Sequence, residues 1–164
     1  MSPEQAKFLA AALGQQLQQE WMTTYKVFAA IPEGKKDWKP ETNSRTAWEL
    51  ARHIAEADVG FLGAVATNSL AAYPAKPVGN TIADLASWYK HEFPKGLEKV
   101  LALDGVHLAQ IFDAWGMKMP SVALLIFCNN HMIHHRGQLT TYLRPMGGKV
   151  PAIYGGSFDE EYKG

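Results

Sequence analysis

Apolar residues recur at helical spacing along four long segments of the chain, and polar loops with proline or glycine separate them. The first segment opens with Ser2, a good N-cap, followed by Pro3 at the first helical position and by Gln5, which completes a capping box. These signals predict a helix over residues 3–30. Its apolar stripe recurs every four residues, at Leu9, Leu13, Leu17, Trp21 and Tyr25.

A second helix is predicted over residues 44–69, with Asn43 or Ser44 as its N-cap. One side of it is apolar, whereas the small residues Ala57, Gly60 and Ala64 leave room for close helix packing or for a pocket. The apolar side carries Leu50, Ile54, Phe61, Leu62 and Val65.

The remaining two helices have clear boundaries. The third begins near Asn80 or Thr81 and reaches about residue 104, and Pro94 inside it predicts a kink or a split. The fourth is predicted over residues 121–144 and ends before a Pro-Met-Gly-Gly run.

Between these two helices the pattern is less regular. Residues 111–115 and 117–119, on either side of Gly116, fit two short extended pieces, and the tail after Lys149 is irregular. Four long helices without a convincing run of strands predict an all-α fold, an antiparallel four-helix bundle, in a single domain over residues 1–164.

Composition narrows the class of protein. Lys plus Arg equals Asp plus Glu at 16 each, which argues against a nucleic-acid binder that neutralises phosphates. The single cysteine, Cys128, excludes an intramolecular disulfide and fits a reducing compartment. There is no signal-peptide pattern at the N-terminus and no apolar run near the ~20 residues of a membrane span. We therefore expect a soluble cytoplasmic protein.

The fourth helix carries the candidate chemistry. His131 and His135 are four residues apart, so they lie on one helix face, and two imidazoles in that arrangement can bind one transition metal. A wheel places both inside the apolar stripe, facing the core, and places His134 at its edge. A buried polar network of structural histidines is the alternative, because neutral imidazoles also bury well when hydrogen-bonded.

A third ligand should come from a facing helix, and His53 in the second helix is the best candidate. A core histidine bonded to a backbone carbonyl is the simpler explanation of His53 in isolation. Three histidines from two helices, with coordination positions left for water or substrate, are however the usual plan of a catalytic site. No paired Glu-x-x-His units are present, which favours a mononuclear site. His91 and His107 are expected at the surface or in a loop.

Three more residues are candidates for roles around the site, each with a simpler alternative. Cys128 lies one turn before His131 and is either a ligand or a small core residue. Glu49 is a candidate proton acceptor or a helix-surface carboxylate. Arg136 is a candidate for binding an anionic substrate, an anchor for the C-terminal tail, or a solvated side chain.

These residues also carry a family resemblance. The segment Asn130–Arg144, with its His-x-x-His-His-Arg-Gly-Gln core, and the Gly-Gly and Val-Pro-x-x-Tyr-Gly runs that follow it resemble the C-terminal signature of the DinB family of metalloenzymes. The stretch Trp48–Ile54 resembles the helix of that family that donates the first metal-binding histidine.

The resemblance implies a four-helix bundle of up-down-down-up order with a long crossover after the second helix. It implies a divalent metal, commonly nickel or zinc, on His53, His131 and His135, and often a homodimer. Some members are S-transferases that use bacillithiol, and more distant ones act with mycothiol or glutathione. The leading hypothesis is therefore a metal-dependent transfer of a low-molecular-weight thiol to a small electrophile. Metal-assisted hydrolysis and a non-enzymatic, stress-associated metal-binding role are the alternatives.

Overall fold

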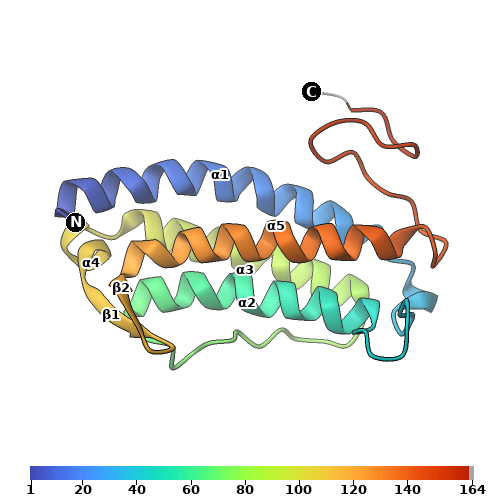
Figure 1. Cartoon of the computed structure of the whole chain (residues 1–164), viewed down its shortest axis with the longest axis horizontal. Coiled ribbons are helices and arrows are strands. Elements are labelled where there is room, and N and C mark those ends of the chain that lie inside the picture. Colours follow the sequence, from blue (N-terminus) through green and yellow to red (C-terminus); the bar gives the residue numbers. More distant parts are fainter. Residues whose placement is uncertain (163–164) are drawn as a thin grey trace.

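Four long helices lie side by side and make up most of the molecule (Figure 1). The computed structural model describes residues 1–162. The long helices are α1 (Pro3–Ala29), α2 (Ala47–Thr67), α3 (Ile82–Ala102) and α5 (Leu124–Leu143). The predicted all-α class is confirmed in so far as the structure is mostly helical, with a small two-stranded sheet, and the antiparallel four-helix bundle stays a prediction.

Each long helix packs against two others: α1 and α2 both contact α3 and α5. One continuous apolar core fills the space between them, with Leu17, Leu50, Leu97 and Leu139 among its buried residues. The segment between α2 and α3 runs back along the length of the helices before α3 begins (Figure 1). The full up-down-down-up order stays a prediction. None of the helices within residues 1–162 is long and apolar enough to cross a membrane.

The capping box predicted at the start of α1 is confirmed. The Gln5 backbone N donates to Ser2 Oγ at 3.2 Å, and the Ser2 backbone N donates to Gln5 Oε1 at 2.9 Å. Thr81 forms the same kind of cap for α3 with Asp84. Helix α3 continues through Pro94, so the alternative of a split helix is wrong. Buried side chains on both sides of the proline hold the flanking turns to the core.

The predicted start of α2 is wrong by a few residues. Thr46 is the N-cap, since its Oγ1 accepts from the Glu49 backbone N at 3.1 Å and its own backbone N donates to Glu49 Oε2 at 2.8 Å. Ser44 instead donates its hydroxyl to Glu41. Several good capping residues stand close together here, and only the reciprocal bond to Glu49 selects Thr46.

A small hairpin and a short helix occupy the irregular segment before α5. Helix α4 (Gly105–Ala109) was not predicted, whereas β1 (Ile111–Ala114) and β2 (Met117–Pro120) confirm the two extended pieces around Gly116. The strands pair antiparallel. A 3-10 turn, η2 (Ser121–Ala123), precedes α5, which therefore begins later than predicted. A second such turn, η1 (Glu33–Lys35), follows α1.

Candidate metal centre

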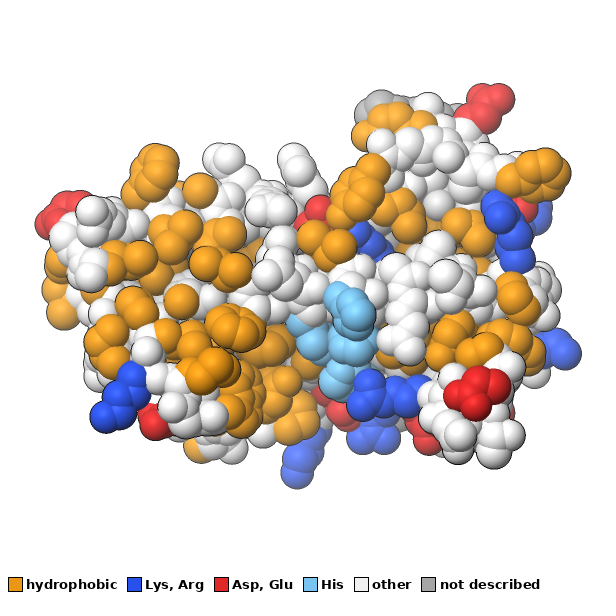
Figure 2. Space-filling model, in the orientation of Figure 1, with side chains coloured by type: hydrophobic (Ala, Val, Ile, Leu, Met, Phe, Trp, Pro, Cys, Tyr) orange, Lys and Arg blue, Asp and Glu red, His pale blue; other side chains and the backbone are white. Residues whose placement is uncertain are grey.

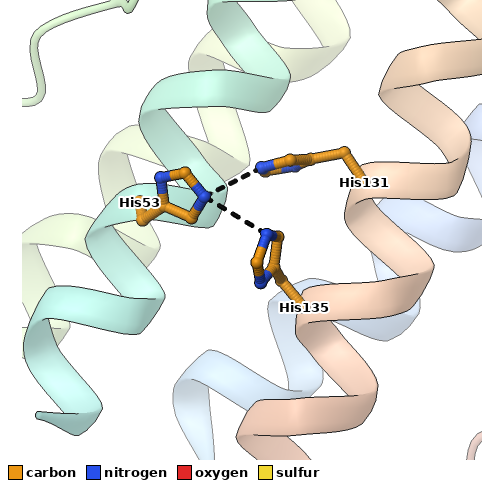
Figure 3. A group of neighbouring side chains, drawn as sticks. All are labelled: His53, His131 and His135. Atoms are coloured by element: carbon orange, nitrogen blue, oxygen red, sulfur yellow. Dashed lines mark hydrogen bonds between the residues drawn. The ribbon is translucent and has the colours of Figure 1, made fainter. Parts of the chain in front are cut away.

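Three histidine side chains converge from two helices. His53 comes from α2, and His131 and His135 come from successive turns of α5 (Figure 3). The Nε2 atom of His53 lies 3.1 Å from Nε2 of His131 and 3.3 Å from Nε2 of His135. These three form the one group of metal-ligating side chains found within residues 1–162. The structure thus brings together the three predicted ligands.

The packing of α2 against α5 creates this arrangement. All three rings are half-buried. Figure 2 shows histidine side chains reaching the surface, with hydrophobic side chains on one side and Lys or Arg side chains on the other. The site is therefore open to solvent, although much of each imidazole is covered.

The spacing of the nitrogens fits a shared metal ion. Two imidazole nitrogens at about 2.0–2.1 Å from one zinc-sized ion lie roughly 2.9 Å apart at a right angle and roughly 3.4 Å apart at a tetrahedral angle. The distances from His53, 3.1 and 3.3 Å, fall between these two values. Each ring also turns its Nε2 atom toward the other two, so three lone pairs can converge on one ion (Figure 3).

The outer nitrogens of two rings have fixed partners. Nδ1 of His131 lies 3.0 Å from Oδ1 of Asp58, and Nδ1 of His135 lies 3.1 Å from Oε1 of Gln138. Both oxygens accept hydrogen bonds, so they favour the tautomers with the proton on Nδ1 and a lone pair on Nε2. A neutral His53 can donate to only one of these lone pairs. Nε2 of the remaining ring then faces Nε2 of His53 without a shared proton, and the two nitrogens repel each other unless a cation lies between them. This favours a metal site over a purely hydrogen-bonded network.

Asp58 is a site residue that the sequence interpretation missed. Its carboxylate is fully buried, and Oδ2 accepts a hydrogen bond from the Tyr89 hydroxyl at 2.9 Å. A histidine ligand whose second nitrogen bonds a carboxylate is a common arrangement around metals, because the carboxylate fixes the ring and raises its basicity. One signal was available: Asp58 interrupts the apolar stripe between Ile54 and Phe61 of α2.

The environment keeps the three imidazoles uncharged near neutral pH. Burial, helped by the charge of Arg45, lowers the pKa of His53 to about 4. Burial also lowers the pKa of His131 to about 4 and lowers the pKa of His135. For Asp58, burial raises the pKa, while the Tyr89 hydrogen bond and the Arg136 charge oppose that effect. Neutral imidazoles are the form that binds metals.

Cys128 lies in the core, about one turn of α5 before His131. Its side chain is fully buried, and its thiol donates to the backbone oxygen of Asp58 at 3.7 Å. Burial raises the pKa of the thiol well above its usual value. Cys128 is absent from the group of converging ligand atoms, so these contacts match the simpler of its two predicted roles, a small core residue.

The other candidates lie in different environments. Glu49 is exposed, and its carboxylate is engaged in the cap of α2. His134 is exposed and contacts the ring of His135, with centroids 4.7 Å apart. His91 is exposed as expected. His107 is half-buried, and its Nε2 lies 2.8 Å from the backbone oxygen of Val65.

Arg136 points away from the histidines and into the core, where it is 2% exposed. Its Nη1 lies 2.6 Å from Oε2 of Glu20, and its Nη2 donates to the Tyr154 hydroxyl. Tyr154 in turn donates to Glu20. Of the roles considered for Arg136, the structure matches the anchor of the C-terminal tail, and binding of an anionic substrate would require this ion pair to break.

Comparison with known proteins finds relatives in Bacillus subtilis. Over 128 residues the chain is 31% identical to the uncharacterized protein YrdA of Bacillus subtilis, an alignment that covers 74% of this chain and 75% of YrdA. It is 26% identical over 126 residues to the uncharacterized protein YjoA of the same organism, covering 76% and 82%.

Solved structures show the same fold. The crystal structure of the DinB-like protein YjoA from Bacillus subtilis has a TM-score of 0.70 at 26% identity, covering 83% of this chain and 92% of that one. A DinB-like protein from Bacillus cereus has a TM-score of 0.69 at 24% identity, covering 87% and 95%. The family model of the DinB family matches residues 3–163. The chain therefore belongs to the DinB family.

Proposed function

We propose that this protein holds one divalent metal ion on His53, His131 and His135. The observation that carries the proposal is the convergence of three Nε2 atoms from two helices, at 3.1 and 3.3 Å from His53. Imidazole ligands suit zinc, nickel, copper and iron. We propose nickel or zinc, in keeping with the family resemblance.

The same geometry favours a catalytic site over a closed structural one. Structural zinc sites have four protein ligands, whereas catalytic sites have three and leave room for water or substrate. Within residues 1–162 no carboxylate or thiol joins the three histidines. The three rings are also only half-buried, which leaves part of each accessible to a small molecule.

We propose that the reaction is transfer of a low-molecular-weight thiol to a small electrophile. A divalent metal at this site supplies Lewis acidity, which lowers the pKa of a thiol that binds it. The thiol loses its proton to solvent, its sulfur forms a bond to the electrophilic carbon, and the leaving group departs with the electron pair of the broken bond.

The residues of the chain prepare the site for this role. Neutral His53 and His131 offer lone pairs without first having to lose a proton, since each has a pKa of about 4. Asp58 holds His131 in position through Nδ1. The negative charge of an ionised Asp58 is also compensated by a cation on the three rings, which offsets the cost of burying the carboxylate.

Elemental analysis of protein purified without a histidine tag tests the metal. We expect about one equivalent of metal per chain in the wild type and loss of it in the double variant His131→Ala, His135→Ala. Exposed His91→Ala is the matched control and should retain the metal. Stoichiometric metal in the double variant would refute the site.

Thiol consumption with a model electrophile tests the transfer. We expect turnover with one member of a panel of low-molecular-weight thiols, loss of turnover with a chelator, and recovery on adding metal back. A metal-loaded protein that consumes no thiol would overturn the transferase proposal and leave hydrolysis or a non-enzymatic role. Release of acid from an ester panel by the same preparation would identify hydrolysis.

A further inference from the structure

Three aromatic side chains lie against one another beside His131, and we call them the aromatic wall: Phe61, Tyr73 and Trp115. Their ring centroids are 5.2 Å apart for Phe61 and Tyr73, 5.1 Å for Tyr73 and Trp115, and 6.0 Å for Phe61 and Trp115. The Phe61 ring lies 5.6 Å from the ring of His131. The wall therefore extends from a predicted metal ligand to the surface, where Trp115 is 50% exposed.

Trp115 occupies a backbone position that does not suit it. It has φ +54° and precedes Gly116 with φ +84°, in the two-residue turn between Ala114 and Met117 of the hairpin. Such turns favour Asn-Gly, Asp-Gly or Gly-Gly, because both positions need positive φ. A bulky side chain is strained there, and half of this one also faces water. Strain of this kind concentrates at ligand sites, so we expect the Trp115 side chain to have a function in addition to closing the hairpin.

The second ring of the wall is held by a close approach to α2. A Cβ atom at Gly60 would lie 2.7 Å from Cδ2 of Tyr73, so the glycine lets the tyrosine lie directly on the helix. The backbone N of Ala75 donates to the backbone oxygen of Glu56 on the same helix at 3.0 Å. The wall thus takes one ring from α2, one from the segment 68–81 and one from the hairpin turn.

Resting on the metal site proposed above, we propose that the aromatic wall is a substrate subsite. It takes the flat apolar group, such as an aromatic ring, of a molecule whose polar end reaches the three histidines. The rings pack at 5.1–6.0 Å from one another and leave no open cage for an organic cation. A cationic group would also be repelled by the neighbouring metal charge, whereas a flat apolar group gains contact with Tyr73 and Trp115 and covers their exposed surface.

Two small chelators test the subsite. Acetohydroxamate and benzohydroxamate carry the same metal-binding group and differ in a methyl group against a phenyl ring. Their dissociation constants are measured by calorimetry on protein whose metal content has first been established. For the wild type we expect benzohydroxamate to bind on the order of tenfold more tightly, the size expected for one aromatic contact with its buried area.

Trp115→Asn is the informative variant, because Asn-Gly is favoured in this turn and should keep the hairpin folded. We expect it to reduce the preference for benzohydroxamate to threefold or less without changing the affinity for acetohydroxamate. Phe8→Ala removes another exposed aromatic ring, 77% exposed on α1, and should leave the preference unchanged.

The outcomes separate this inference from the metal proposal. A metal-loaded protein that binds both chelators equally, or a preference that survives Trp115→Asn, would overturn the aromatic subsite and leave the metal site standing. Protein that takes up no metal when metal is supplied, and therefore binds neither chelator, would overturn both.

Discussion

Replacing Asp58 by Asn should weaken metal binding without unfolding the protein. The change keeps the size of a fully buried side chain that joins His131 Nδ1, at 3.0 Å, to the Tyr89 hydroxyl, at 2.9 Å. The amide has no negative charge. It can also present its NH2 group to His131, which selects the tautomer with a proton on Nε2, and that tautomer cannot bind a metal.

The expected size follows from this single contact. Loss of a carboxylate partner of a histidine ligand typically weakens metal binding by roughly 10–100-fold, or about 1.4–2.7 kcal/mol. Excess metal should therefore stabilise the folded Asp58→Asn variant less than it stabilises the folded wild type, by the same free energy. For a chain of this length the rise in Tm on adding metal should shrink by roughly 3–11 °C. The metal-free form should lose much less, because a neutral amide is cheaper to bury than a carboxylate.

Competition with a chromogenic chelator measures the affinity, and thermal unfolding with and without EDTA measures the two stabilities. Asp37→Asn, which removes an exposed carboxylate, is the charge-matched control and should behave as the wild type. Wild-type metal affinity in Asp58→Asn, alongside loss of metal in His131→Ala, would refute the orienting role. Equal destabilisation of the metal-free and metal-bound forms would assign Asp58 to folding alone.

Three further predictions concern stability. Arg136→Met should lower the free energy of unfolding by about 3–5 kcal/mol, because it leaves the Glu20 carboxylate buried without its counter-ion; adding Glu20→Gln should recover part of this loss, and a change in metal stoichiometry instead would argue for a direct role at the site. Thr46→Ala should cost about 1 kcal/mol through loss of the α2 cap, measured by urea unfolding, with metal content unchanged. The pKa of about 4 for His53 and His131 lies below the ordinary value of 6.5, so the unfolded chain binds more protons between these values. The stability of the metal-free protein should therefore be highest above pH 6.5 and fall as the pH drops toward 4; denaturant midpoints that stay constant over this window would contradict the burial of neutral rings.

Local sequence signals located most of the helices. The reciprocal pair Ser2 and Gln5 placed the start of α1, because a capping box depends only on residues three apart. The start of α2 was misplaced where Ser44 and Thr46 compete for the same role. Helical spacing also identified His131 and His135 as a pair on one face, which needs no knowledge of the other helices.

Contacts between distant segments decided the rest. A helical wheel predicted one apolar face for α5. In the structure α5 packs against both α1 and α2, so a second face is buried as well, and this face places Arg136 against Glu20. Asp58 showed only as an interruption of a stripe, since its partner His131 lies 73 residues away. The extended pieces around Gly116 were predicted, but only the packing of the hairpin brought the ring of Trp115 against Phe61 and Tyr73.

By itself the sequence determined the helical segments and the histidine pair, because these depend on spacing along one helix. Tertiary structure decided that His53 meets this pair, that Asp58 holds one ring and that Trp115 stands beside the site. Each of these depends on the distance between side chains on different elements, which only packing of the core sets.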